Sequence, residues 1–222
     1  MSFSDQAVEE TVNFVKSQTT GEGTGHDWFH IQRVWQTACY IHSQEGEGDL
    51  FIIQMTALLH DLADEKLGDE MAGLKKIVYF LEGLGLSQNK IEQILANVQS
   101  ISYHKQLVQE SLSVESQIVQ DADRLDAMGA IGIARAFTYG GSLGQAIWDP
   151  ASDPRLQDDP SDLTPTTINH FYQKLLLLKD QMNTEIGQAL AQDRHQFMLT
   201  YLDQFYQELD RAEDLEAPEA PD

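Results

Sequence analysis

The chain has 222 residues, of which 41% are hydrophobic and 23% are charged, as is typical of a globular protein with one sizeable core. Its 14 Lys and Arg residues against 36 Asp and Glu residues give a formal net charge of −22. Because so acidic a surface repels phosphate backbones and anionic lipids, we expect neither a nucleic acid polymer nor a membrane as a partner.

Features that would place the protein outside the cytoplasm are missing from the sequence. No apolar run approaches the roughly 20 residues needed to cross a membrane. The segment MSFSDQAVEE lacks the basic and apolar regions of a signal peptide. The single cysteine, Cys39, excludes an internal disulfide framework and a cysteine-based zinc site. We therefore expect a cytoplasmic protein.

Hydrophobic positions at helical spacing predict one helix after another, with no series of alternating strands. The expected helices span about 4–17, 26–43, 49–64, 69–82, 88–104, 114–127, 129–138, 165–180 and 184–209. Residues 49–64 are apolar on nearly every side, which favours a place in the centre of a bundle. The pair Thr164-Pro165 is typical of an N-cap and first helical residue. We predict an all-α fold.

Two segments are expected to be irregular. Residues 140–162 contain several glycines and prolines, which indicates a long surface loop. Residues 213–222, which end in EAPEAPD, are expected to form an acidic flexible tail. The remaining residues, 1–212, are expected to form a single domain.

Polar residues interrupt three of the apolar segments. In GHDWFHIQRVW, His26, His30 and Arg33 lie four and three residues apart and so share a helix face. The alternative interpretation is a capped helix start with histidines at its rim. In ALLHDLADEK, His60 and Asp61 are embedded in the most hydrophobic predicted helix, where their burial is costly unless a partner or a metal compensates. The alternative is a solvated helix end.

The third interruption is the segment IVQDADRLDAMGAIG, in which three aspartates and an arginine break a small apolar helix. Asp123 and Asp126 are three residues apart, whereas Asp121 lies on another side. Taken alone, the segment also fits a charged surface network between Arg124 and Asp126.

Together the three segments indicate a divalent metal site. Imidazole and carboxylate groups are the ligands of metals with nitrogen and oxygen preference. Two histidines and two aspartates leave coordination positions open for water and for a substrate oxygen, as catalysis requires. Helix bundles build such sites from side chains that project inward from different helices.

The ordered set of motifs resembles the HD-domain superfamily of metal-dependent phosphohydrolases, in its stand-alone bacterial type. The motifs are HDWFHIQRV, LLHDLAD and DADRLDA, and the resemblance covers about residues 24–130. It implies an HD-type helical bundle with additional C-terminal helices and one divalent metal, which is manganese, iron, cobalt, nickel or magnesium. By motif position the metal ligands are His30, His60, Asp61 and Asp123, the last chosen over Asp121 and Asp126 by pattern alone.

The same resemblance implies hydrolysis of a phosphoester or phosphoanhydride, with a (deoxy)nucleotide as the leading substrate class. Related nucleotidases carry an acidic residue three positions after the His-Asp pair that orients the attacking water. That position is Asp64 here, with Glu65 as its neighbour. Because the substrate is anionic and the chain is acidic, we expect local positive charge at the site. The candidates for substrate binding are His26, Arg33, Lys66 and His104.

Other functions compatible with this pattern are hydrolysis of a signalling nucleotide and a non-catalytic role as a metal or nucleotide sensor. Every ligand position of the motif is filled, which favours an enzyme over a sensor. A purely structural acidic helical protein would leave the His60-Asp61 pair unexplained. A homodimer is compatible with the sequence.

Overall fold

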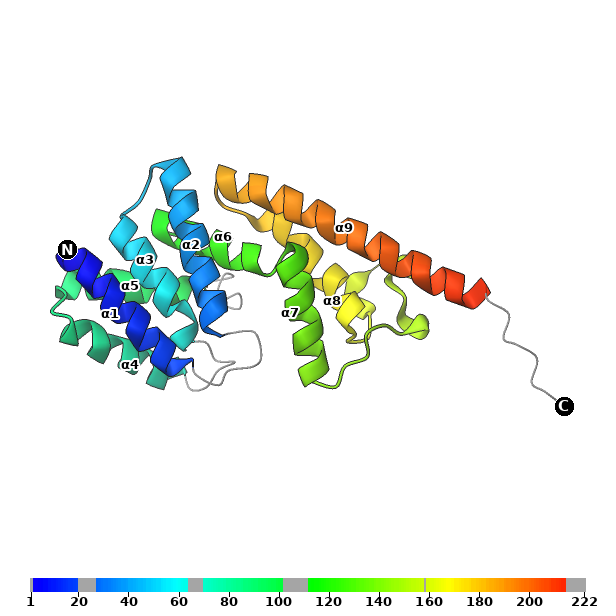
Figure 1. The fold of residues 1–222 in the computed structure, drawn as a ribbon, viewed down its shortest axis with the longest axis horizontal. Helices are drawn as coiled ribbons and strands as arrows, with labels where there is room; N and C mark the ends of the chain where they lie inside the picture. Colours follow the sequence, from blue (N-terminus) through cyan, green and yellow to red (C-terminus); the bar gives the residue numbers. More distant parts are fainter. Residues whose placement is uncertain (1, 20–26, 64–69, 102–111, 158, 215–222) are drawn as a thin grey trace.

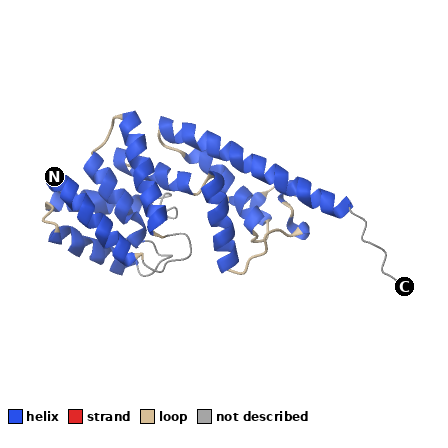
Figure 2. Cartoon of the chain, viewed as in Figure 1, coloured by secondary structure: helices blue, strands red, loops and turns tan. Residues whose placement is uncertain are grey.

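The computed structural model describes residues 2–19, 27–63, 70–101, 112–157 and 159–214. Within these ranges the regular elements are all helices and no strand occurs, so the predicted all-α fold is confirmed (Figure 2). None of the described helices is both long enough and apolar enough to cross a membrane.

Nine α-helices follow one another along the described ranges (Figure 1). Their bounds are α1 Phe3–Gln18, α2 Trp28–Glu45, α3 Leu50–Leu59, α4 Glu70–Gly83, α5 Gln88–Ile101, α6 Val114–Asp126, α7 Gly129–Ser142, α8 Thr167–Gln173 and α9 Glu185–Asp214. Short 3-10 helices lie between them: η1 His60–Ala63, η4 Pro150–Ser152, η5 Pro154–Leu156, η6 Pro160–Asp162 and η7 Leu175–Gln181.

Helix α3 occupies the centre of the N-terminal half, as its sequence predicts. It packs against α1, α2, α5 and α6, and eight of its ten residues are buried. The helix begins where the Asp49 side chain accepts a hydrogen bond from the backbone N–H of Phe51 at 2.8 Å. A helix covered on all sides has no polar face toward solvent, which is why only Gln54 and Thr56 of its ten residues are polar.

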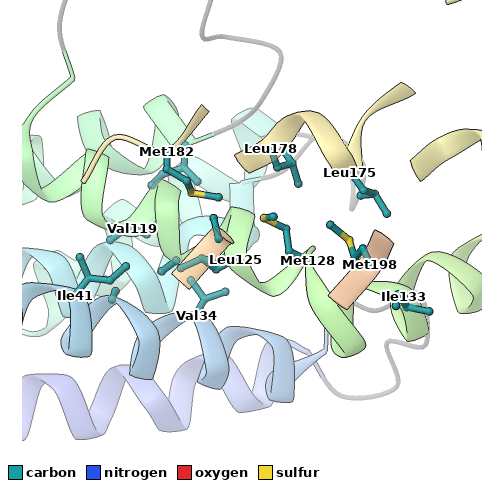
Figure 3. Packing of buried hydrophobic residues seen from close by; sticks show 14 of the residues in the cluster. Val34, Ile41, Val119, Leu125, Met128, Ile133, Leu175, Leu178, Met182 and Met198 are labelled. Atoms are coloured by element: carbon teal, nitrogen blue, oxygen red, sulfur yellow. The ribbon is translucent and has the colours of Figure 1, made fainter. Parts of the chain in front are cut away.

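Helix α6 joins the two halves of the molecule. It contacts α2, α3 and α5 on one side and α7 and α9 on the other. A single cluster of buried side chains follows it, with Val34 and Ile41 of α2, Val119 and Leu125 of α6, and Met198 of α9 (Figure 3). Figure 1 shows α9 running from beside α2 and α6 to the far end of the molecule.

Several predicted boundaries differ from the structure. The helix predicted from Pro165 to about residue 180 is wrong, because Thr166 rather than Thr164 caps α8 by accepting a hydrogen bond from Asn169 N–H. The backbone N–H of Thr164 instead donates to Ser152, and the chain leaves the α conformation at Lys174 (φ −142°).

The predicted surface loop at 140–162 is shorter and more ordered than expected. Helix α7 continues to Ser142, and η4, η5 and η6 occupy much of the remainder. Pro150 and Pro154 each open a 3-10 turn behind a capping aspartate, because proline has no N–H to leave unsatisfied there.

At the C-terminus, α9 extends to Asp214, beyond the predicted end near Leu209 and into the first two residues of the predicted tail. No proline occurs before Pro218 to stop the helix earlier. The rest of the predicted tail, 215–222, lies outside the described residues.

Candidate metal centre

Three chain segments meet where the sequence places its polar interruptions: the start of α2, the end of α3 with η1, and the last turns of α6. Asp27 caps α2 by accepting a hydrogen bond from the backbone N–H of His30 at 2.9 Å, which fixes His30 in the first turn. The His30 side chain is fully buried. The rim interpretation of this histidine is therefore wrong.

The His60-Asp61 pair lies in η1, where the chain tightens after α3 into a 3-10 turn. Both residues are buried, at 6% and 4% exposure, so the solvated helix end is also excluded. The 3-10 turn interrupts the single helix predicted over 49–64, at the position of the His60-Asp61 pair.

The ligand atoms of the two histidines and Asp61 lie close together. His30 Nε2 is 3.3 Å from Asp61 Oδ2, and His60 Nε2 is 3.2 Å from Asp61 Oδ1. One ligand atom from each of these three residues lies within 4.8 Å of the others, so the group is able to hold a metal ion. Asp123 Oδ1 faces the same group, 3.5 Å from His30 Nε2 and 3.8 Å from His60 Nε2.

Each histidine is held through its Nδ1 atom. His60 Nδ1 lies 2.8 Å from the backbone oxygen of Ala57, and His30 Nδ1 lies 2.7 Å from Asp126 Oδ2. These contacts require a proton on each Nδ1 and direct each Nε2 toward Asp61 and Asp123. Within the described residues, His60 Nε2 is buried and makes no hydrogen bond. A nitrogen lone pair that faces carboxylates in this way is suited to a divalent cation between them.

The electrostatics of His30 bear on metal loading. Burial alone would lower the pKa of His30. Its hydrogen bonds to Asp126 and Asp61 outweigh the effect of burial and raise the pKa to about 9. Without a metal, His30 is therefore protonated at neutral pH. Metal binding to its Nε2 must release that proton.

The three aspartates of α6 have different surroundings. Asp121 is fully buried and accepts hydrogen bonds from Asn183 and Thr184 at the start of α9. Asp126 is buried and accepts from Arg33 and Arg135 as well as His30. Of the three, Asp123 is the one whose carboxylate faces both Nε2 atoms. The surface network between Arg124 and Asp126 is wrong, because both side chains are buried.

The pKa values of Asp121 and Asp126 are shifted in opposite directions. Burial raises the pKa of Asp126, but its hydrogen bonds from His30 and Arg33 lower it well below its usual range. Burial raises the pKa of Asp121, and the hydrogen bonds from Asn183 and Thr184 only partly oppose that rise.

A cavity of about 310 Å³ lies on the other side of Asp126, whose carboxylate contacts His30 Nδ1; none of the four candidate metal ligands lines it. Arg33 and Arg194 line it, together with Gln36, Thr37, Met128 and the first residues of α7. Arg194 also donates a hydrogen bond to the backbone oxygen of Leu125. Arg33, predicted to bind substrate, thus lines this cavity and is connected to His30 through Asp126.

The other predicted site residues are not placed by the structure. His26, Asp64, Glu65, Lys66 and His104 lie outside the described residues. Conversely, Arg135 and Arg194 were not predicted from the sequence, and Asp126 was predicted only as an alternative ligand or as part of a surface network with Arg124. The spacing of Asp126 from Asp123 was the available signal, since residues three apart share a helix face.

The chain is similar to known proteins in sequence and in fold. A family model for the HD domain matches residues 28–128. The chain is 38% identical to YpgQ of Bacillus subtilis over 205 residues, which cover 91% of this chain and 93% of YpgQ.

Solved structures of similar sequence have the same fold. A structure of an HD-superfamily hydrolase from Bacillus thuringiensis is 41% identical, with a TM-score of 0.75, and the match covers 93% of this chain and 98% of that one. A structure of Bacillus subtilis YpgQ in complex with ADP is 35% identical, with a TM-score of 0.73, and covers 90% and 97%.

Proposed function

Because the chain belongs to the HD-domain family, we propose that it is a metal-dependent hydrolase of nucleotide phosphoesters or phosphoanhydrides. One observation carries this proposal: two buried histidines and two aspartates from three chain segments converge with their ligand atoms facing one another. The proposed metal ligands are His30, His60, Asp61 and Asp123. The donor set of imidazole nitrogens and carboxylate oxygens suits manganese, iron, cobalt, nickel or magnesium.

The substrate class follows from charge and from a relative. The chain carries a net charge of −22, yet Arg33 and Arg194 both line the cavity that reaches the candidate metal site through Asp126. Such local positive charge is suited to phosphate groups. The related YpgQ has been crystallised with ADP, which supports a nucleotide as the ligand here. His26, Lys66 and His104 remain proposed contributors to substrate binding.

The reaction needs a water molecule, a polarised phosphoryl group and stabilisation of developing negative charge. A bound divalent metal supplies a water of lowered pKa and polarises a phosphoryl oxygen. Arg33, which Asp126 holds by a hydrogen bond of 2.6 Å, is the residue that we propose stabilises charge on the phosphate oxygens. Asp64 is the proposed orienting group or general base for the attacking water, with Glu65 as its neighbour.

We expect the metal-stripped protein to be inactive and Mn²⁺ to restore hydrolysis of at least one nucleotide. The test is a panel of nucleoside mono-, di- and triphosphates and guanosine tetraphosphate, with the products resolved. Pyrophosphate and a monophosphate from triphosphates identify a pyrophosphohydrolase, and inorganic phosphate from monophosphates identifies a nucleotidase. If metal is bound but no nucleotide is turned over in a metal-dependent manner, the proposed function is wrong.

Replacing Asp64 by Asn is expected to slow turnover by a factor on the order of 10² to 10⁴ while the metal stays bound, because the variant loses a proton acceptor but no proposed ligand. The measurement is kcat together with metal content by elemental analysis. Loss of the metal in parallel with the activity would instead make Asp64 a ligand.

A further inference from the structure

We propose that Asp126 is a positioning residue that holds the His30 ring in its metal-binding orientation and ties it to two arginines. The inference rests on the proposed metal site but not on the identity of the substrate. It starts from the last turn of α6, where Asp126 is buried and lies 96 residues from His30 in the sequence.

Two carboxylates from one face of α6 lie near the two nitrogens of the His30 ring. Asp123 and Asp126 are three residues apart and therefore lie on the same side of the helix. Asp126 Oδ2 is 2.7 Å from Nδ1, and Asp123 Oδ1 is 3.5 Å from Nε2. The helix thus fixes the ring through one nitrogen and supplies a candidate metal ligand beside the other.

The carboxylate of Asp126 has four hydrogen-bonding contacts, one at Oδ1 and three at Oδ2. Arg33 donates from Nε to Oδ1 at 2.6 Å and from Nη2 to Oδ2 at 3.0 Å. Arg135 donates from Nη1 to Oδ2 at 2.8 Å. Together with His30, these donors engage both oxygens, which leaves Asp126 an anchor rather than a ligand. The two arginines also fix the rotamer of the carboxylate.

The two histidines obtain their acceptors from different parts of the chain. His60 obtains its acceptor locally, from the backbone oxygen of Ala57 one turn earlier. His30 is in the first turn of α2, where the corresponding oxygen, that of Asp27, accepts from the N–H of Ile31 at 3.3 Å. A carboxylate from α6 takes this role for His30. Partners of this kind orient metal-binding histidines and raise their basicity.

The test is the affinity of the metal-stripped protein for Mn²⁺ alone, measured by calorimetric titration without nucleotide. The variant Asp126→Asn keeps the size of the side chain but replaces an acceptor oxygen by an NH₂ group that faces donors. We expect its dissociation constant for Mn²⁺ to rise about 10- to 100-fold. A folded variant, shown by circular dichroism, that binds Mn²⁺ as tightly as the original chain would overturn the proposal.

Asp153→Asn is a matched control. Asp153 is 4% exposed, as is Asp126, and it also accepts a hydrogen bond from an arginine, Arg155 Nη2, at 2.7 Å. It lies between η4 and η5, away from the histidines. Its replacement is expected to leave the Mn²⁺ affinity unchanged. An equal loss of affinity in both variants would assign the effect to general destabilisation and would also overturn the proposal.

If Asp126→Asn does not fold, a measurement on the unaltered protein tests whether Asp126 orients the His30 ring. Long-range ¹H–¹⁵N spectra of the Zn²⁺-loaded protein report which His30 nitrogen carries the proton. We expect a protonated Nδ1 and a metal-bound Nε2, and the reverse assignment would contradict the proposal. Because no nucleotide is present in either experiment, a failure of nucleotide hydrolysis is distinguishable from a failure of this inference.

Discussion

Replacing His60 or Asp61 by Ala is expected to abolish stoichiometric metal binding and hydrolysis together. His60 supplies a buried nitrogen, and both oxygens of Asp61 lie within 3.3 Å of a histidine Nε2, so each variant removes a central member of the group. Loss of the metal removes several kcal/mol of stabilisation of the transition state. The expected fall in kcat/KM is therefore on the order of 10³-fold or more.

The measurement combines metal content by elemental analysis, kcat/KM, and the shift of Tm on addition of Mn²⁺. The original chain should be stabilised by Mn²⁺, because a metal that binds only the folded state shifts the unfolding equilibrium, and the two variants should not be. His42→Ala is a suitable control, because His42 lies at the other end of α2 and contacts the backbone oxygen of Gly48. Full metal content and full turnover in either site variant would refute the site assignment.

Replacing Asp121 by Ala is expected to lower the free energy of unfolding by about 3 kcal/mol. The carboxylate is fully buried and accepts hydrogen bonds from the backbone N–H groups of Asn183 and Thr184 and from both of their side chains. The two backbone groups lie immediately before α9, whose first turn Thr184 caps by accepting a hydrogen bond from the N–H of Gly187. Asp121 thus ties the entry of α9 to α6.

The pKa of Asp121 clarifies the source of this loss. Burial raises the pKa of Asp121 more than its hydrogen bonds lower it. Folding therefore disfavours the ionised form of this carboxyl group relative to the unfolded chain. The loss in the variant comes from donors that are left buried without an acceptor. Asp121→Asn retains one acceptor oxygen and is expected to lose less stability than Asp121→Ala. Urea unfolding of both variants measures the difference, and a loss below about 1 kcal/mol for the alanine variant would show that water or repacking satisfies the donors.

Gly187 belongs to the same contact. A methyl group at this position would overlap the Asp121 carboxylate and the Thr184 hydroxyl. The close approach of α9 to α6 thus depends on glycine at that position.

The sequence predicted those elements whose surroundings follow from the pattern of their own residues. The apolar run 50–59 has no polar face and was placed correctly in the centre of the bundle. His30, His60 and Asp61, named from their motifs, do lie together. Roles that depend on distant partners were not predictable. The hydrogen bond between His30 and Asp126 spans 96 residues, and nothing in the spacing within one helix reveals the arginines that surround Asp126.

The predicted helix start at Thr164-Pro165 was wrong because a tertiary hydrogen bond competes with the local capping pattern. Thr164 and Pro165 have the composition of a helix start, yet the N–H of Thr164 donates to the Ser152 hydroxyl and the helix begins two residues later. The periodicity of residues 49–64 likewise concealed the 3-10 turn at His60, because hydrophobic spacing does not distinguish a tightened last turn from a regular one.

The position of α6 has a consequence for any attempt to isolate the part of the chain that the family model matches. A fragment of residues 28–128 would keep α6 but lose α7 and α9, which cover it on one side, and α1, which packs on α3. Val119, Leu125 and Met128 would lose partners such as Met182 and Met198. Exposed apolar area of this kind promotes self-association. We expect such a fragment to aggregate, so proteolytic trimming should yield either the whole helical assembly or small peptides rather than a stable excised core.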